Sequence, residues 1–331
     1  MNDANRIACG YYDKPEIGCT NQDSDIDAAY TQALLFALGG DAALGPSARS
    51  IISLYSTGLK KYQNNTAGTC CGNEALQAAW IGAKITRAAE LLRHTPGSGW
   101  TEEDSASFSA LMYTVHLPHL YNGTQSNGNW MASFLEAMLG MAVFSENATL
   151  FAHAVEGWRT RAPSYWYIAS DGAAPPPNPQ PNCAPQPFCE WYNQSVYDAR
   201  VSGVCQETCR DMGHMQMGFA AFVNGATTAA LQGADLFQEQ APRLLAASEF
   251  AAKLLTNFTP ATSPLLCSGQ PVTLALMPTF EVANAAFTRL GLDAPHTRAQ
   301  LVENVRPKTV GGQNRSQCSV WETLSHGLPL P

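Results

Sequence analysis

The residues best suited to chemistry lie in one short run, Cys205-Gln-Glu-Thr-Cys-Arg-Asp-Met-Gly-His-Met-Gln-Met-Gly218. If this run is helical, Arg210, His214 and Met217 lie on one face, because residues four and seven positions apart align in a helix. Gln206 would share that side. A guanidinium binds a carboxylate through paired hydrogen bonds, and an imidazole transfers protons near neutral pH. The run therefore predicts a site for a carboxylate-bearing substrate.

The same residues have a purely structural interpretation. Arg210 could instead be the buried ion-pair partner of a nearby acid, namely Glu207, Asp211 or Glu136. An isolated histidine in an apolar helix is more often a core residue than a catalyst, and only the neighbouring Arg210 favours a chemical role for His214.

Two further segments carry polar or aromatic groups that a site could use. In Ser126-Asn127-Gly128-Asn129-Trp130, Asn129 is either a site residue or the N-cap of a helix that starts at Trp130. The aromatic run Tyr165-Trp166-Tyr167 is either part of the core or a platform on which a sugar stacks.

Repeated helical periodicity indicates the elements that position these residues. Ser24 and Asp27 resemble a capping box, Thr101 and Asp104 are expected to open a helix through Leu111 and Tyr113, and Asn73 to His94 places its apolar side chains on one stripe. Further helices are expected at about 131–144, 147–160, 207–233, 242–256, 278–290 and 296–304. Val272 to Leu276 and Tyr165 to Ile168 are short strand candidates.

The segment from Gly213 to Gly233 carries no formal charge, so it is expected to be buried on nearly all sides. Such a helix fits the centre of an assembly of helix pairs. The predicted fold is therefore all-α, an incomplete α/α toroid in one domain over residues 1–331.

Composition excludes several classes of protein. The 331 residues are 45% hydrophobic and carry a net charge of −8, which indicates a globular chain without the basic surface that nucleic acids require. Charged residues make up 14% against roughly 25% in a typical soluble protein. No apolar run is long enough to span a membrane. The first residues lack a signal-peptide pattern, so we expect a mature chain.

Cysteines and glycosylation signals indicate the compartment. Ten cysteines predict five disulfides, with Cys183–Cys189 as one candidate pair, and their spacing does not fit a zinc site. Asn-x-Ser/Thr triplets occur at Asn64, Asn122, Asn147, Asn193, Asn257 and Asn314. Together they predict an extracellular glycoprotein without metal or cofactor, expected to be monomeric.

Four segments resemble the alginate-lyase-like polysaccharide lyases, which are built on an α/α toroid. They are Asn127 to Trp130 with Glu136, Trp158 to Tyr165 with Ser170 to Gly172, Cys205 to Gly218, and Gln232 to Leu236. The resemblance implies β-elimination on a β-1,4-linked polyuronate, either polymannuronate or glucuronan. Neutralising the C6 carboxylate makes the C5 proton more acidic, and the leaving O4 then takes a proton.

Carried onto this chain, the resemblance implies roles for four catalytic residues. Asn129 and Arg210 match the groups that neutralise the carboxylate, and His214 matches a base or neutraliser. Where relatives have a catalytic tyrosine, this chain has Met217, so Tyr165 is the candidate, followed by Tyr167 and Tyr113. Without such a tyrosine, His214 would serve as both base and acid. The expected substrate-binding residues are Trp130, Gln206, Gln216, Trp166 and Tyr167.

Two alternatives stay open. A glycoside hydrolase on a similar toroid would use a pair among Glu136, Glu207 and Asp211, but Glu207 and Asp211 on one helix could not flank a sugar from both sides. A carbohydrate-binding protein without catalysis is the other, because the usual tyrosine is missing. An unsaturated product would distinguish the lyase from both.

Overall fold

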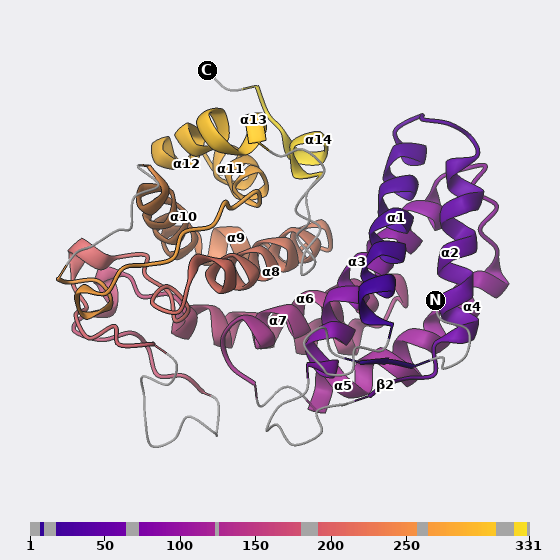
Figure 1. Ribbon diagram of the computed structural model, residues 1–331, viewed down its shortest axis with the longest axis horizontal. Coiled ribbons are helices and arrows are strands. Elements are labelled where there is room, and N and C mark those ends of the chain that lie inside the picture. The colour runs from indigo at the N-terminus through magenta and orange to yellow at the C-terminus, as the bar shows by residue number, and fades with distance from the viewer. Residues whose placement is uncertain are drawn as a thin grey trace. The chain divides into compact units, whose positions relative to one another are not determined.

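The computed structural model describes residues 7–9, 18–63, 73–122, 126–179, 191–256, 264–308 and 321–329 (Figure 1). Helices dominate this part of the chain, which confirms the predicted all-α class. Within the described ranges no helix is both long and apolar enough to cross a membrane.

The described residues form two compact units. The first contains the residues up to 122 together with Ser133–Ala154, and the second contains 126–132 and the described residues from Val155 onward. The boundaries fall inside two helices, α6 (Gly128–Phe144) and α7 (Ala148–Tyr165). A single domain over residues 1–331 stays a prediction.

In the first unit, α1 packs against α2 and α3, and α2 packs against α4. These helices and their neighbours are α1 (Cys19–Ala37), α2 (Leu44–Gly58), α3 (Glu74–His94), α4 (Glu102–Leu111), the π-helical η1 (Met112–His116) and α5 (Leu117–Asn122). Helix α3 is buried on most sides, and Lys84, only 1% exposed, forms an ion pair with Asp27 at 2.7 Å. The Asp27 side chain is 43% exposed, whereas Asp23, only 4% exposed, lies 3.7 Å from the same ammonium, so the buried charges of this unit are Lys84 and Asp23.

Two strands that periodicity did not predict also belong to this unit. Strand β1 (Ile7–Cys9) pairs in parallel with β2 (Lys61–Gln63), with Ile7 opposite Lys61. Each has three residues, too few to give a detectable alternation. The two predicted strand candidates are wrong: residues 272–276 are irregular, and Trp166 makes only an isolated bridge with Cys205.

The second unit is built around α8 (Met212–Leu231), whose side chains are buried over most of its length. Around it lie α9 (Leu236–Glu239), α10 (Ala241–Leu255), α11 (Phe280–Arg289), α12 (Pro295–Gln300), η7 (Leu301–Val305), α13 (Arg306–Lys308) and α14 (Glu322–His326). Short 3-10 turns occur at η3 (Ala169–Asp171), η5 (Ala199–Val201) and η6 (Cys267–Gly269). The predicted burial of the Gly213–Gly233 segment is confirmed up to Ala229.

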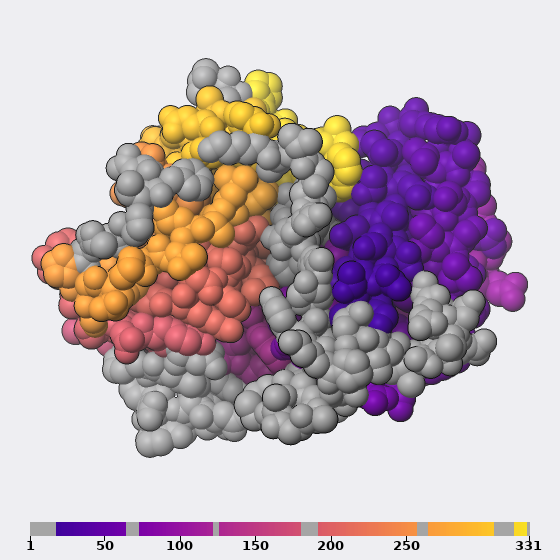
Figure 2. Space-filling view, viewed as in Figure 1, coloured from indigo at the N-terminus to yellow at the C-terminus, as the bar shows by residue number. Residues whose placement is uncertain are grey.

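An irregular segment, residues 264–279, crosses the visible surface of this unit as an orange band (Figure 2). It is held at the start of α8, where the backbone N–H of Met212 donates to the carbonyl of Thr273 at 2.8 Å. The disulfide Cys209–Cys267 fixes it a second time. The residues just before α8 are therefore held to this segment at two points, Cys209 and Met212.

Helix starts differ from the sequence prediction in two places. Helix α1 begins at Cys19, so Ser24 lies inside it and donates its hydroxyl to the Thr20 carbonyl instead of capping the helix. Helix α8 begins at Met212, and Arg210 therefore lies before the helix. By contrast, the helix start predicted at Thr101 and Asp104 is confirmed, and these two residues form a capping box at the start of α4.

The cysteines only partly follow the prediction. The disulfide Cys209–Cys267 is present, whereas Cys205 keeps a free thiol that is 1% exposed. The prediction that all ten cysteines form disulfides is therefore wrong for Cys205. Burial raises the pKa of this thiol to about 12, against an opposing hydrogen bond from Thr208. The candidate pair Cys183–Cys189 lies outside the described residues.

Candidate functional site

His214 is oriented by the residue that caps α8. Asp211 is the N-cap, and its Oδ1 accepts the backbone N–H of His214 at 2.8 Å. Its Oδ2 lies 2.7 Å from His214 Nδ1. Burial raises the pKa of Asp211, but hydrogen bonds from the side chain and backbone of His214 outweigh it and leave the pKa below its usual value. An ionised carboxylate only accepts, so Nδ1 carries a proton and Nε2 of the neutral ring is the basic atom.

The accessibility of this pair suits proton transfer. The side chains of His214 and Asp211 are 29% and 28% exposed, so the imidazole is anchored on one edge and still reaches solvent. A histidine held by a carboxylate through Nδ1 is the arrangement that general-base catalysis uses.

Arg210 lies in the turn that precedes Asp211, so it does not share a helix face with His214 and Met217. Its Nη1 is 3.6 Å from Oε2 of Glu207, and its guanidinium lies over the ring of Tyr192, 5.7 Å from the ring centroid. The Arg210 side chain is 38% exposed. A guanidinium has five N–H donors, so one loose pairing with Glu207 leaves donors that can bind an outside anion.

Asn129 reaches the same carboxylate from another element. It is the second residue of α6 and hence not the N-cap, and it is completely buried. Its side-chain amide donates to Oε1 of Glu207 at 3.1 Å, and its backbone N–H does so at 3.4 Å. Asn129 and Arg210, both expected to bind a carboxylate, thus meet at the two oxygens of an internal one.

A second set of contacts joins the other segments that the resemblance used. Arg161 donates to the carbonyl of Ser126 and to the side-chain oxygen of Asn178, each at 2.6 Å. Asn178 in turn donates to the side chain of Asn127. The polar run before α6 and the last turns of α7 are therefore held together, a role of Arg161 that spacing did not reveal.

Tyr165 lies in the interior. Its side chain is 2% exposed, and a Cβ added to Gly218 would be 2.0 Å from its hydroxyl, so the phenol lies directly on the backbone of α8. That contact is four residues after His214. A hydrogen bond from the hydroxyl is among the influences on the Cys205 thiol. Tyr165 therefore contacts α8, the helix that carries His214, but on the buried side of that helix.

The predicted substrate-binding residues are mostly buried as well. Trp166 and Tyr167 have no exposed surface, and the Tyr167 hydroxyl donates to the carbonyl of Gly172 at 2.8 Å, which favours the core interpretation of the aromatic run. Gln206 and Gln216 are 1% and 6% exposed. Trp130, by contrast, is half-buried and keeps part of its surface.

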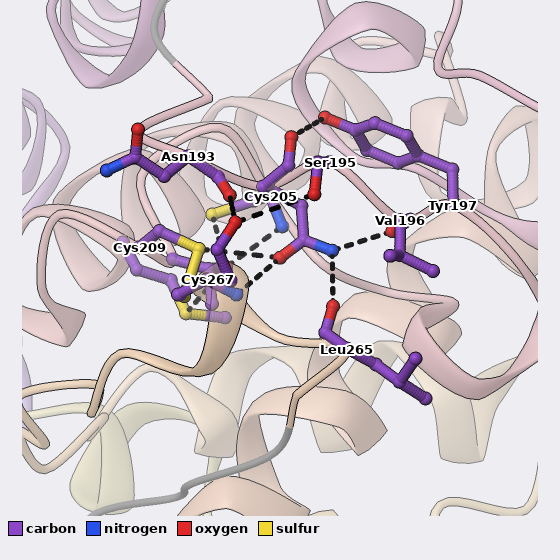
Figure 3. The surroundings of a disulfide bond; sticks show 12 residues. Asn193, Ser195, Val196, Tyr197, Cys205, Cys209, Leu265 and Cys267 are labelled. Carbon is purple, nitrogen blue, oxygen red and sulfur yellow. Dashed lines mark hydrogen bonds between the residues drawn. A yellow bond between two sulfur atoms is a disulfide. The ribbon is translucent and has the colours of Figure 1, made fainter.

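Sequence reasoning missed the turn that carries Tyr192. The side chain of Gln194 binds this turn to the irregular segment: its Nε2 donates to the carbonyls of Val196 and Leu265 at 2.6 and 3.0 Å. Its Oε1 accepts the backbone N–H of Cys267 at 2.8 Å (Figure 3). A buried glutamine among loop residues gives no periodic signal, so the sequence offered no sign of this arrangement.

The three acidic residues considered for a hydrolase are each paired with another side chain, Asp211 with His214 at 2.7 Å. Glu207 and Asp211 do not lie on one helix, as the sequence suggested, but in the turn before α8 and at its N-cap. Glu207 is 3% exposed and contacts Asn129 and Arg210. In the first unit, Glu136 is buried against Arg87 at 2.5 Å.

No protein-family model matches this chain, and a search of curated proteins finds no similar sequence.

Proposed function

We propose that this chain is a polysaccharide lyase that cleaves a β-1,4-linked polyuronate by β-elimination and leaves a 4,5-unsaturated uronate end. The observation that carries the proposal is the pairing of His214 with Asp211 at 2.7 Å, together with the partly exposed cation of Arg210, the residue just before Asp211. A base and a cation side by side are what removal of a proton next to a carboxylate requires.

In this proposal Arg210 binds the C6 carboxylate and stabilises the negative charge that develops as the C5 proton leaves. His214 Nε2 takes that proton, and Asp211 stabilises the imidazolium. Asn129 is buried and holds Glu207, so it positions Arg210 rather than contacting the polymer. The tight contact of Tyr165 with Gly218 fixes α8 beneath the site.

The wider setting is part of the same proposal. We infer a single α/α toroid, which the helical content and the buried α8 support. A secreted, monomeric glycoprotein is also proposed, and the Cys209–Cys267 disulfide is consistent with an oxidising compartment.

The test is ultraviolet absorbance of unsaturated ends on polymannuronate, polyguluronate and glucuronan in parallel. The wild-type protein is expected to act on polymannuronate or glucuronan. Arg210→Ala should lower the rate about 10²–10³-fold, since it removes charge stabilisation in the transition state.

Arg200→Ala is the matched control, because Arg200 is an exposed arginine of the same unit and, within the described residues, pairs only with its neighbour Asp198 at 2.5 Å. It should keep the wild-type rate. An absence of absorbance change on all three polymers with folded wild-type protein would contradict the proposal.

A further inference from the structure

β-Elimination leaves one chemical need unmet by the residues assigned so far. When the C4–O4 bond breaks, the departing O4 carries negative charge and must take a proton. His214 has accepted the C5 proton, and Arg210 binds the carboxylate. A third side chain with a transferable proton at the same surface would protonate O4 without the proton on His214 having to move.

The tyrosines predicted from sequence are poorly placed for that task. Tyr165 is 2% exposed beneath α8, and Tyr167 is fully buried with its hydroxyl committed to Gly172. The Tyr113 hydroxyl accepts the side-chain amide of Asn147 at 2.8 Å and lies 2.8 Å from the hydroxyl of Ser145.

Tyr192 differs from these in exposure and surroundings. It is 38% exposed, and its ring lies against the Arg210 guanidinium. A cation over an aromatic face at this distance is attracted by the ring, so the two side chains restrain each other. The phenol therefore stands beside the group that would hold the substrate carboxylate.

The turn that carries Tyr192 has a backbone conformation that non-glycine residues disfavour. Tyr192 and Asn193 have φ angles of 43° and 72°, in the left-handed region that residues other than glycine rarely adopt. The hydroxyl of Ser268 donates to the carbonyl of Asn193 at 2.8 Å, and Gln194 ties the turn to Leu265 and Cys267. The disulfide joins Cys267 to Cys209, the residue before Arg210 (Figure 3). One set of contacts thus fixes both Tyr192 and Arg210.

We propose that Tyr192 is the proton donor to the leaving O4, an inference that rests on the lyase function proposed above. His214 Nε2 removes the C5 proton, and that C–H electron pair forms the C4–C5 double bond. The C4–O4 bond breaks as O4 takes the phenolic proton of Tyr192. Water then returns a proton to the phenolate and takes the one held by His214.

The test compares Tyr192→Phe and Tyr192→Ala on two substrates. On the polymer, Tyr192→Phe should lower kcat about 10²–10⁴-fold with KM nearly unchanged, because the ring still supports Arg210. Tyr192→Ala should show the same loss and a further rise in KM of about two- to fivefold, because the ring is gone. Tyr121→Phe, at an exposed tyrosine of the first unit, is the control and should match wild type.

The second substrate is a uronate carrying a nitrophenol at O4, which leaves without taking a proton. Tyr192→Phe should act on it nearly as fast as wild type, which a merely structural role of Tyr192 would not produce. An active wild-type enzyme with unimpaired Tyr192→Phe on the polymer, or an equal loss on both substrates, would overturn the assignment of Tyr192 alone. A wild-type protein inactive on every polymer would overturn the lyase function and this inference with it.

Discussion

A histidine and a cation of the first unit are buried, whereas a histidine and a cation of the second unit are partly exposed. In the first unit, His116 is completely buried, its Nδ1 lies 2.8 Å from the carbonyl of Ala78, and burial lowers its pKa to about 4. In the second, His214 is 29% exposed and paired with a carboxylate. One ring is kept neutral inside the core, and the other is oriented at a surface.

The cations repeat this contrast. Lys84 is 1% exposed and bound to Asp27 at 2.7 Å, whereas Arg210 is 38% exposed and only loosely paired with Glu207 at 3.6 Å. A buried ion pair has no capacity left for a ligand, and its removal mainly costs stability. Residue type therefore does not identify a site in this chain; the degree of exposure and the tightness of pairing do.

The largest expected effect is a difference in turnover between variants of the two histidines. His214→Gln should lower turnover about 10²–10⁴-fold without a matching loss of stability, because it removes the general base. His116→Gln should retain turnover, because that ring lies in the core of the other unit. The measurement is kcat on the preferred polymer together with thermal unfolding. Equal rates for the two variants would remove the distinction.

The next effect concerns the stability of the first unit. Lys84→Ala should lower the free energy of unfolding by about 3 kcal/mol, because it leaves the buried carboxylate of Asp23, 3.7 Å from the Lys84 ammonium, without this cation. Lys60→Ala is the control, since Lys60 is exposed and, in the part of the chain that the structure describes, bonds only to the carbonyl of Thr57. Urea unfolding of the three proteins would measure the difference. A loss for Lys84→Ala no larger than that for Lys60→Ala would show that the pair is dispensable.

The smallest effect is a pH dependence of stability that comes from His116. Its pKa is about 4 in the folded protein and near 6.5 when unfolded, so the unfolded state binds more protons between these values. Its contribution is therefore complete above pH 6.5 and decreases as the pH falls towards 4, by up to about 3 kcal/mol. Urea unfolding across this range should show a steeper loss for wild type than for His116→Gln. Parallel curves would contradict the assignment.

Periodicity predicted the helices well because each buries an apolar stripe, and α3, α6 and α10 end within a residue or two of the expected positions. It misplaced the start of α8, although the signal was present: Asp211 is a good N-cap, and this places the first helical residue at Met212. Because of that error, the sequence analysis placed Arg210 on one helix face with His214 and Met217, whereas Arg210 lies before the helix.

The site was harder to predict because its partners are distant in sequence. The Asn129–Glu207 contact joins residues 78 apart, and the Cys209–Cys267 disulfide joins residues 58 apart. Pairings of this kind have no signature in spacing. Tyr192 was missed for the same reason, since its position depends on the loop contacts of Gln194.

The most direct test of the central claim is proton NMR of the oligosaccharides released from the polymer by wild-type protein. The account predicts a vinylic H4 signal from each new non-reducing end, produced in equal number with new reducing ends and lost with His214→Gln. New reducing ends accompanied by saturated non-reducing ends would show hydrolysis and contradict the proposed elimination.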